Sequence, residues 1–409
     1  MSPSDRPVIG PLLTRRQVLA GSAVAAAGLA LRPVRSLAVG TPAETLAPPR
    51  DLESFVLDRL KAGRLPGVSA AIVRDGQLWS RGFGEANLPR DRHVDSGTIF
   101  MLASISKTVI CTAVMQAVED GLFALDDDVD DVLPFSVRIP GFPNRKITAR
   151  QLLTHTSAIR DRWPVWDDLY SQGDSPIGLG EFLEGYLVPG GEDYREGNFY
   201  GFAPGKDYRY SNVGASLAAY LVEAASGIGF DVWCNDRIFE PLEMTRTGWH
   251  LADVSRSEVA MPYRWSADLG KFVPYGHYGY PDYPDGALRT TARHLCHHMG
   301  MVMNGGEWNG VRILSAESVQ EIRRSQVPGI ESGQGLIWYR FGFHGRSLVG
   351  HNGGDQGVAT VAFFEPDTGI GVAVLGNGNW RKDGNRWPLQ EIMQRLFEDA
   401  PQLLEIGTS

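Results

Sequence analysis

The sequence has few cysteines, fewer basic than acidic residues, and no long hydrophobic run. Its 409 residues include only three cysteines, Cys111, Cys234 and Cys296, and no two of them have Cys-x-x-Cys spacing. This excludes a zinc knuckle and gives no disulfide framework. Lys and Arg number 39 against 48 Asp and Glu, a net charge of −9, so a nucleic-acid groove is not expected. The length and the 43% hydrophobic content are those of a globular protein with a substantial core.

The first 38 residues have the pattern of an export signal. Thr14–Leu19 contains paired arginines, and a weakly apolar run rich in alanine and glycine continues to Leu31. This run is too short to span a membrane, and the small-x-small sequence ending at Ala38 is typical of a cleavage site. No cysteine lies near that site to carry a lipid. We expect a twin-arginine signal over residues 1–38 and a periplasmic or secreted protein without a stable membrane anchor. A short buried or amphipathic helix is the alternative interpretation.

The two ends of the remaining chain are predicted to form strands. Residues 68–74 and 77–82 are expected to pair through the turn Asp75-Gly76, and further strands are expected at 347–350, 358–364 and 370–375. Helical spacing predicts helices at 51–63, 100–119, 147–154, 211–226, 291–304 and 389–397. This order predicts an α/β fold with one antiparallel sheet built from both chain ends and flanked by helices. The sheet part is expected at about 45–120 and 290–409, and a mostly helical part at about 121–289.

A serine and a lysine three residues apart are the first candidate for chemistry. In Ser104-Ile105-Ser106-Lys107, one helical turn brings both side chains to the same face, at or near a helix start. A serine hydroxyl needs a neighbouring base before it becomes a good nucleophile, and a partly buried lysine with a lowered pKa can act as that base. Ser-x-x-Lys alone occurs by chance about once in a chain of this length, so other segments must support it.

Two further segments give that support. Tyr210-Ser211-Asn212 lies at the start of the predicted helix 211–226. A tyrosine and an amide at this position could contribute to general-base catalysis and hold a substrate carbonyl. Gly350-His351-Asn352-Gly353-Gly354 lies on a predicted strand, where glycines admit a substrate edge and His351 can exchange protons with a reacting group. Taken singly, these segments could be a packed tyrosine with a helix cap and a glycine-rich turn with an incidental histidine. Their order after Ser104 favours a catalytic site.

In this order, Ser-x-x-Lys, Tyr-Ser-Asn and His-x-Gly resemble the motifs of the serine β-lactamase and penicillin-binding protein superfamily. The branch that looks most similar contains class C β-lactamases, D-alanyl-D-alanine carboxypeptidases, D-aminopeptidases and related esterases. Subsidiary stretches agree with it, namely Phe100–Ala103, Leu152–Ser157, Pro241–Met244 and Asp285–Thr291. The resemblance covers about residues 65–375 and implies a domain of sheet and helices plus a helical domain, with Ser104 at their interface.

The resemblance also implies an acyl-enzyme mechanism without metal or other cofactor. Ser104 would attack an ester or amide carbonyl, and Lys107 and Tyr210 would together act as the base and return the proton to the leaving group. Backbone N–H groups of Ser104 and Gly354 would form the oxyanion hole. The predicted catalytic residues are Ser104, Lys107, Tyr210 and His351, and the predicted substrate-binding residues are Asn212, Asn352, Gly353 and Gly354.

The third motif limits the class of substrate that we expect. Class C β-lactamases typically carry Lys-Thr-Gly there, whereas this chain has His351-Asn352-Gly353, and His-x-Gly also occurs in some carboxypeptidases, D-aminopeptidases and esterases of the superfamily. We expect hydrolysis of small esters or amides, with D-amino-acid peptidase, carboxypeptidase or β-lactamase activity as alternatives. Two further alternatives are an acyltransferase and a penicillin-binding or sensing homologue that is acylated but does not turn over its substrate. The expected partner is a small ester, amide or peptide, and the sequence leaves the oligomeric state open.

Other clusters have both a structural and a functional interpretation. His294, Cys296, His297 and His298 share one predicted helix, and the pattern favours an ordinary amphipathic helix over a metal site. The acidic stretch 125–131 lacks the ligand spacing of an EF-hand. Aromatic residues crowd 160–205 and 262–284, where they form either a substrate wall or ordinary packing. Four histidines are interpreted as structural: His155, His250, His277 and His344.

Overall fold

The computed structural model describes residues 52–162, 169–381, 383 and 387–406, so the predicted export signal and Trp163 and Trp166 lie outside the described residues. The helices are α2 (Leu52–Gly63), α3 (Lys107–Glu119), α4 (Ala149–Leu153), α6 (Leu179–Leu187), α7 (Asn212–Ser226), α8 (Phe230–Cys234), α9 (Ala292–Met303), α10 (Ala316–Arg323) and α11 (Pro388–Ile406). The strands are β1 (Gly67–Arg74), β2 (Gln77–Asn87), β3 (Arg92–His93), β4 (Phe100–Met101), β5 (Ser171–Gln172), β6 (Tyr263–Ser266), β7 (Lys271–Pro274), β8 (Tyr278–Gly279), β9 (Arg289–Thr290), β10 (Glu307–Trp308), β11 (Val311–Arg312), β12 (Tyr339–Phe343), β13 (Arg346–Asp355), β14 (Val358–Glu365) and β15 (Ile370–Gly376).

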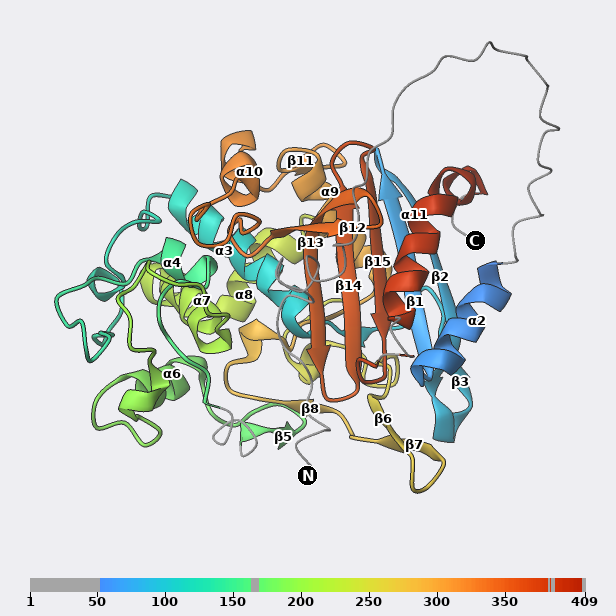
Figure 1. Cartoon of the computed structure of the whole chain (residues 1–409), viewed down its shortest axis with the longest axis horizontal. Helices are drawn as coiled ribbons and strands as arrows, with labels where there is room; N and C mark the ends of the chain where they lie inside the picture. Colours follow the sequence, from blue (N-terminus) through green and yellow to red (C-terminus); the bar gives the residue numbers. More distant parts are fainter. Residues whose placement is uncertain (1–51, 163–168, 382, 384–386, 407–409) are drawn as a thin grey trace, which may run out of the picture.

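The main sheet joins the two ends of the chain. Its seven strands follow the order β12-β13-β14-β15-β1-β2-β3, and neighbouring strands are antiparallel (Figure 1). β1 pairs with β15, with Val68 opposite Gly376. The turn between β1 and β2 is at Asp75 and Gly76, whose φ angles of 50° and 78° are those of a two-residue hairpin turn. The predicted antiparallel sheet built from both chain ends is therefore confirmed.

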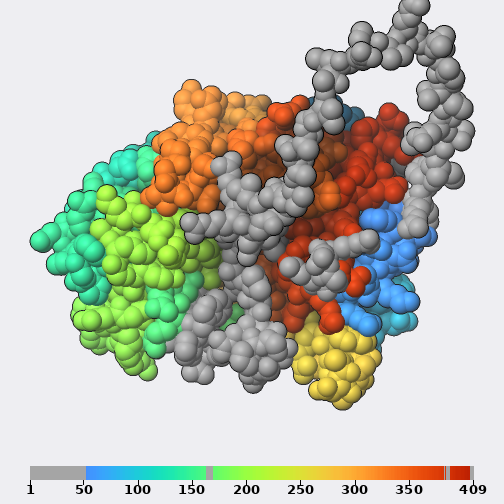
Figure 2. Space-filling model, in the orientation of Figure 1, coloured from blue at the N-terminus to red at the C-terminus, as the bar shows by residue number. Residues whose placement is uncertain are grey.

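Both faces of this sheet are covered by helices, and β1 is accordingly buried along almost its whole length. Ala70 and Ile72 pack in one core cluster with α2 and α11, whereas Ala71 and Val73 belong to a second cluster with α3, α7 and α9. Side chains alternate between the two faces of a strand, so a strand covered on both sides is apolar at every position. In the space-filling view, the carboxyl-terminal strands and α11, in red, lie beside the blue amino-terminal segment, with the green middle of the chain at the far end (Figure 2).

The middle of the chain, residues 121–289, holds α4, α6, α7 and α8 together with short strand pairs, β5 with β8 and β6 with β7. The sequence did not predict these strands. α7 packs on α3, whose residues from Lys107 to Ala117 are all buried. Among the described residues, no single helix has the length and apolarity to cross a membrane, and α7 with Phe230–Phe239 passes that test only as a pair bent by 89°. Cys111, Cys234 and Cys296 are free and buried.

The start of the predicted helix 100–119 is wrong. Phe100 and Met101 form β4, which pairs with β9, and Ala103–Ser106 form a 3₁₀ turn before α3 begins at Lys107. The apolar spacing of this stretch reflects burial on a strand as much as on a helix, and pattern alone does not separate the two. Ser104 therefore lies in the turn that connects a strand to a core helix.

Candidate active site

The first motif forms a buried serine–lysine pair. Lys107 Nζ lies 3.2 Å from Ser104 Oγ and donates a 2.7 Å hydrogen bond to the backbone carbonyl of Asp285. Lys107 is fully buried, and Ser104 is 7% exposed. The three-residue spacing thus places the amine within hydrogen-bonding distance of the hydroxyl, as a base for a serine nucleophile requires.

Burial favours the uncharged forms of Lys107 and its neighbour Asp285. It lowers the pKa of Lys107, because the charged amine loses its hydration, while the carboxylates of Asp285, Asp161 and Asp282 act in the opposite direction. Asp285 Oδ2 lies 3.7 Å from the amine, and burial raises the pKa of Asp285 to about 7. Both shifts favour an uncharged amine next to an uncharged carboxyl. An uncharged amine can accept the Ser104 proton.

The second motif places Tyr210 over the amine. The centre of its ring lies 5.2 Å from Lys107 Nζ. Its hydroxyl is buried and has no hydrogen-bond partner among the described residues. Burial raises the pKa of Tyr210 well above its ordinary value, although the nearby Ser104 hydroxyl acts in the opposite direction. Tyr210 is therefore protonated at neutral pH and able to donate a proton, which leaves Lys107 as the group that can first accept one.

Asp161, which the sequence analysis did not identify, holds the second motif in place. Its carboxylate accepts hydrogen bonds from the Asn212 N–H at 2.8 Å, the Val213 N–H at 3.2 Å and the Ser211 hydroxyl at 3.0 Å. A carboxylate at this position satisfies the free N–H groups at the start of α7 and interacts favourably with the helix dipole. The second motif therefore depends on a residue that lies about 50 positions earlier in the chain.

His155, interpreted from the sequence as structural, contacts the second motif directly. Its ring centre lies 4.3 Å from that of Tyr210, and its Nδ1 accepts a hydrogen bond from the Ser211 N–H at 3.3 Å. Burial lowers its pKa well below 6.5, so the ring is neutral. His155 thus packs the candidate proton donor into place. The signal for it was its position in the subsidiary stretch Leu152–Ser157.

The third motif runs along β13 and brings its backbone against Ser104. A Cβ added at Gly353 would lie 3.0 Å from the Ser104 nitrogen and 2.3 Å from the Leu102 carbonyl oxygen. Gly354 lines one pocket with Ser104 and Asn212. β13 is longer than the predicted strand 347–350, and it ends one residue after Gly354. Glycine at 353 is required because there is no room for a side chain where β13 approaches Ser104 this closely.

His351 is buried and uncharged. Its Nδ1 lies 2.6 Å from the Asn352 carbonyl oxygen, and because a carbonyl only accepts, we assign the proton to Nδ1 and leave Nε2 as an acceptor. Burial is the main cause that lowers the pKa of His351 to about 3. Its ring centre is 6.3 Å from that of Tyr210. The Asn352 side chain is engaged within the protein, since its Oδ1 accepts a 2.5 Å hydrogen bond from Tyr339.

The pocket at Ser104 is lined by Ala103, Ser104, Tyr170, Asn212, Tyr280, Asp285, Gly286, Gly354 and Asp355. Among the described residues, this lining includes two acids and no lysine, arginine or histidine. Tyr210 and His351 are not part of this lining. Tyr170 and Tyr280 come from the two aromatic segments that the sequence analysis singled out as a possible substrate wall.

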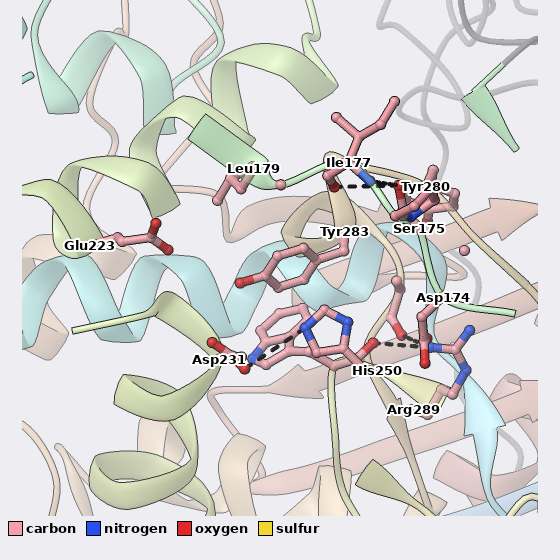
Figure 3. Close-up of a pocket in the computed structure, with 15 residues that line it drawn as sticks. Asp174, Ser175, Ile177, Leu179, Glu223, Asp231, His250, Tyr280, Tyr283 and Arg289 are labelled. Carbon is pink, nitrogen blue, oxygen red and sulfur yellow. Dashed lines mark hydrogen bonds and ion pairs between the residues drawn. The ribbon is translucent and has the colours of Figure 1, made fainter. Parts of the chain in front are cut away.

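A larger cleft of about 240 Å³ adjoins this pocket and shares Tyr280 with it (Figure 3). Its charged groups are used by the fold. Asp174 accepts a 2.6 Å hydrogen bond from the Leu251 N–H, Glu223 accepts one from another backbone N–H at 3.1 Å, and Arg289 donates to three backbone carbonyls. The lining contains no serine paired with a lysine, so this cleft adjoins the reaction centre without being part of it.

The clusters considered as metal sites have other contacts. His298 Nε2 lies 2.9 Å from Thr112 Oγ1, and His297 Nδ1 lies 2.8 Å from a backbone carbonyl oxygen. In the acidic stretch, Asp128 pairs with Arg138 at 2.7 Å. Within the described ranges, no group of three or more histidine, cysteine or acidic residues is arranged to hold a metal ion.

A comparison with known families decides the classification. The family model described as Beta-lactamase matches residues 52–391. The chain belongs to the β-lactamase family. Members of this serine hydrolase family include penicillin-binding proteins and amidases, and the match spans both the sheet and all three motifs.

Individual relatives and solved structures are 20–29% identical to the chain over the residues that align. Penicillin-binding protein 4 of Amycolatopsis lactamdurans is 26% identical over 324 residues, which cover 77% of this chain and 81% of that protein. Penicillin-binding protein 4* of Bacillus subtilis is 29% identical over 177 residues, which cover 42% of this chain but only 35% of that protein. The octameric penicillin-binding protein homologue from Pyrococcus abyssi has a TM-score of 0.66 at 27% identity, covering 84% of this chain and 76% of that one. The D-amino acid amidase from Ochrobactrum anthropi shares the fold, with a TM-score of 0.66 at 20% identity over 86% of this chain and 97% of that one.

Proposed function

We propose that this β-lactamase-family protein is an exported serine hydrolase that cleaves small esters or amides through an acyl-enzyme on Ser104. The observation that carries the proposal is the 3.2 Å contact between the Ser104 hydroxyl and the buried Lys107 amine. The position of Tyr210 over that amine and the close approach of β13 to Ser104 support it.

In the acylation step, Ser104 Oγ forms a bond to the substrate carbonyl carbon and its proton passes to the neutral Lys107 amine. The developing negative charge on the carbonyl oxygen is stabilised by the backbone N–H groups of Ser104 and Gly354. When the carbonyl re-forms, the bond to the leaving group breaks, and Tyr210 donates a proton to it. The protonated Lys107 then restores the proton of Tyr210, so that the acyl-enzyme forms with no net gain or loss of protons.

Deacylation runs the same route in reverse with water as the nucleophile. The water oxygen forms a bond to the acyl carbon and its proton passes to Tyr210, which at the same time gives its own proton to the neutral Lys107 amine. The bond between Ser104 Oγ and the acyl carbon then breaks, and Lys107 returns the proton to Ser104 as the acid leaves. One ester or amide and one water give an acid and an alcohol or amine. If an alcohol or amine replaced water as the acyl acceptor, the same residues would catalyse acyl transfer.

The charge around Ser104 favours substrates without a carboxylate near the reacting bond. His351 replaces the lysine of the class C β-lactamase motif and, with a pKa of about 3, is uncharged at neutral pH. The pocket lining has two acids and no cation among the described residues. A penicillin or a peptide ending in a free carboxylate would find no positive charge there, so we place ester and amide hydrolysis ahead of β-lactamase and carboxypeptidase activity.

Turnover of p-nitrophenyl acetate by the purified wild type and by Ser104→Ala tests this function. We expect steady release of p-nitrophenol by the wild type, with a rate unchanged by EDTA, and a loss of at least about 10³-fold in Ser104→Ala. Equal rates for the two proteins would overturn the assignment of the nucleophile, and loss of the wild-type rate in EDTA would overturn the cofactor-free mechanism.

Export through the twin-arginine route is part of the proposal. It is supported by the paired Arg15 and Arg16 ahead of the apolar run, and by three buried, free cysteines, since that route carries proteins that have already folded. We expect cell fractionation to find the mature protein outside the cytoplasm, and to find only the precursor, inside it, when Arg15 and Arg16 are both replaced by lysine. Normal export of that double variant would contradict the proposal.

A further inference from the structure

We propose that Trp380 is a positioning residue for the reaction, which holds and polarises the peptide group between Gly353 and Gly354. The N–H of this group is the Gly354 donor assigned above to the oxyanion hole. The proposal rests on the hydrolase function above and adds a residue that none of the three motifs contains. It is carried by a hydrogen bond from the Trp380 indole to the Gly353 carbonyl, by the packing of that indole on Gly354, and by the anchoring of the segment Asn377–Trp380.

The hydrogen bond from Trp380 and the proposed hydrogen bond to the substrate use opposite ends of one peptide group. The indole N–H of Trp380 donates to the Gly353 carbonyl oxygen. In a trans peptide the carbonyl and the following N–H point in opposite directions, so a bond that fixes this carbonyl also fixes the direction of the Gly354 N–H. Gly354 lines the pocket that contains Ser104. The indole therefore orients the donor that this pocket presents to a substrate oxygen.

Ser104 and Trp380 lie on opposite faces of β13 at this peptide group. A Cβ added at Gly353 would lie 3.0 Å from the Ser104 nitrogen, whereas a Cβ added at Gly354 would lie 2.6 Å from Cδ1 of the Trp380 ring. Neighbouring residues of a strand direct their side chains to opposite faces. In agreement with this, Trp380 packs against the core cluster that includes α2 and α11, and Ile105, next to Ser104, belongs to the other cluster. The indole thus supports the strand from the face away from the nucleophile.

The segment Asn377–Trp380, which follows β15, is itself anchored to other strands of the sheet. Asn377 accepts a 2.9 Å hydrogen bond from the Gly67 N–H at the start of β1. Asn379 accepts one of 2.6 Å from the Gly357 N–H, in the turn between β13 and β14. The segment therefore connects β1 to the β13–β14 hairpin on which the peptide group lies. Such an anchored support keeps an oxyanion-hole donor in position before the substrate binds, which is the condition for strong stabilisation of the transition state.

The bond from the indole also strengthens the N–H at the other end of the peptide group. A donor at a peptide carbonyl draws electron density towards the oxygen and makes the N–H more positive, so hydrogen bonds through one peptide group reinforce each other. This gain is largest when negative charge develops on the substrate oxygen, which happens in the transition state and not in the bound substrate. Trp380 is therefore expected to lower the barriers of both acylation and deacylation, with little effect on substrate binding.

Trp380→Phe and Trp380→His separate the hydrogen bond from the bulk of the ring. Both variants are smaller than tryptophan, but Nε2 of histidine takes the ring position of the indole Nε1 and can donate from there. With p-nitrophenyl acetate at about pH 8, where an ordinary histidine is neutral, we expect kcat to fall about tenfold in Trp380→Phe and to stay within about threefold of wild type in Trp380→His. KM should change less than about twofold, because acylation and deacylation slow by the same factor.

The matched control is Trp265→Phe, which removes a partly buried indole from β6, outside the lining of the pocket at Ser104. It should keep the wild-type kcat. The pH at which activity rises should be the same in Trp380→Phe as in the wild type, because the indole acts on β13 and not on the serine–lysine pair. A variant that disturbed the Ser104–Lys107 contact would instead move this pH.

Replacement of Trp380 by benzothienylalanine keeps the proposal testable if the smaller side chains do not fold. This amino acid has the shape of tryptophan with sulfur in place of the indole N–H, and we expect the same loss of about tenfold in kcat. Wild-type kcat in this protein or in folded Trp380→Phe, or equal losses in Trp380→Phe and Trp380→His, would overturn the role of Trp380 and leave the hydrolase function standing. Absence of Ser104-dependent acetate turnover in the wild type would instead overturn the proposed function itself.

Discussion

Replacing Lys107 with methionine is expected to lower kcat for p-nitrophenyl acetate about 10⁴-fold. Methionine has a similar length and suits a fully buried position, but it lacks the amine that lies 3.2 Å from Ser104 Oγ. Tyr210 does not compensate, because burial raises the pKa of its hydroxyl and keeps it protonated. For the same reason we expect wild-type activity to rise with pH, as the amine must lose its proton first. Its lowered pKa places this rise below the pH at which an exposed lysine titrates.

The matched control for this variant is Lys61→Met, which removes an exposed lysine from α2. It should have wild-type kcat. Circular dichroism spectra of both variants should match that of the wild type. A lower kcat in Lys107→Met then results from loss of the base and not from unfolding. If Lys107→Met retains activity within about tenfold of the wild type, another group accepts the Ser104 proton and the role given to Lys107 is wrong.

Gly353→Ala is expected to lower kcat/KM by about 10²- to 10³-fold, the usual effect of losing an oxyanion-hole donor. The added methyl group would lie 2.3 Å from the Leu102 carbonyl oxygen and 2.4 Å from Thr360 Oγ1, closer than real contacts allow. β13 must then move away from Ser104, which takes the backbone N–H of Gly354 out of the oxyanion-hole position proposed for it above. Overpacking of this kind also costs about 1–3 kcal/mol of stability, measurable as a lower midpoint in urea unfolding.

Gly342→Ala is the control for Gly353→Ala, because it adds the same methyl group to the neighbouring strand β12, where nothing lies within 4 Å of the new atom. It should change neither kcat/KM nor the unfolding midpoint by a measurable amount. Wild-type activity in Gly353→Ala would show that β13 does not contribute to the reaction, and the oxyanion hole would have to be sought elsewhere.

The parts of the fold that the sequence predicts are those encoded locally. Asp75-Gly76 specifies its turn through backbone conformation alone, and the strands on either side follow from it. The predicted start of helix 100–119 was wrong because Phe100 and Met101 pair with Thr290 and Arg289, nearly 190 residues away. Such a pairing leaves no trace in the spacing of neighbouring residues.

The same distinction applies to the site. Ser104 and Lys107 are one turn apart, so spacing alone indicates their contact, whereas Tyr210 and His351 could be assigned only by their order and by family resemblance. Asp161 and Asp355 were missed because their partners, Asn212 and Tyr170, are 51 and 185 residues away. The lowered pKa of Lys107 depends on complete burial, which is a property of the folded core.

The central claim is that catalysis passes through an acyl group on Ser104, and rapid acid quenching followed by intact-mass and peptide mass spectrometry tests it most directly. Wild-type protein mixed with p-nitrophenyl acetate should gain the mass of one acetyl group within the first turnover, located on the peptide that contains Ser104. Ser104→Ala should gain none. Steady turnover with no acetyl group on Ser104, or the same adduct on another residue of Ser104→Ala, would contradict the account.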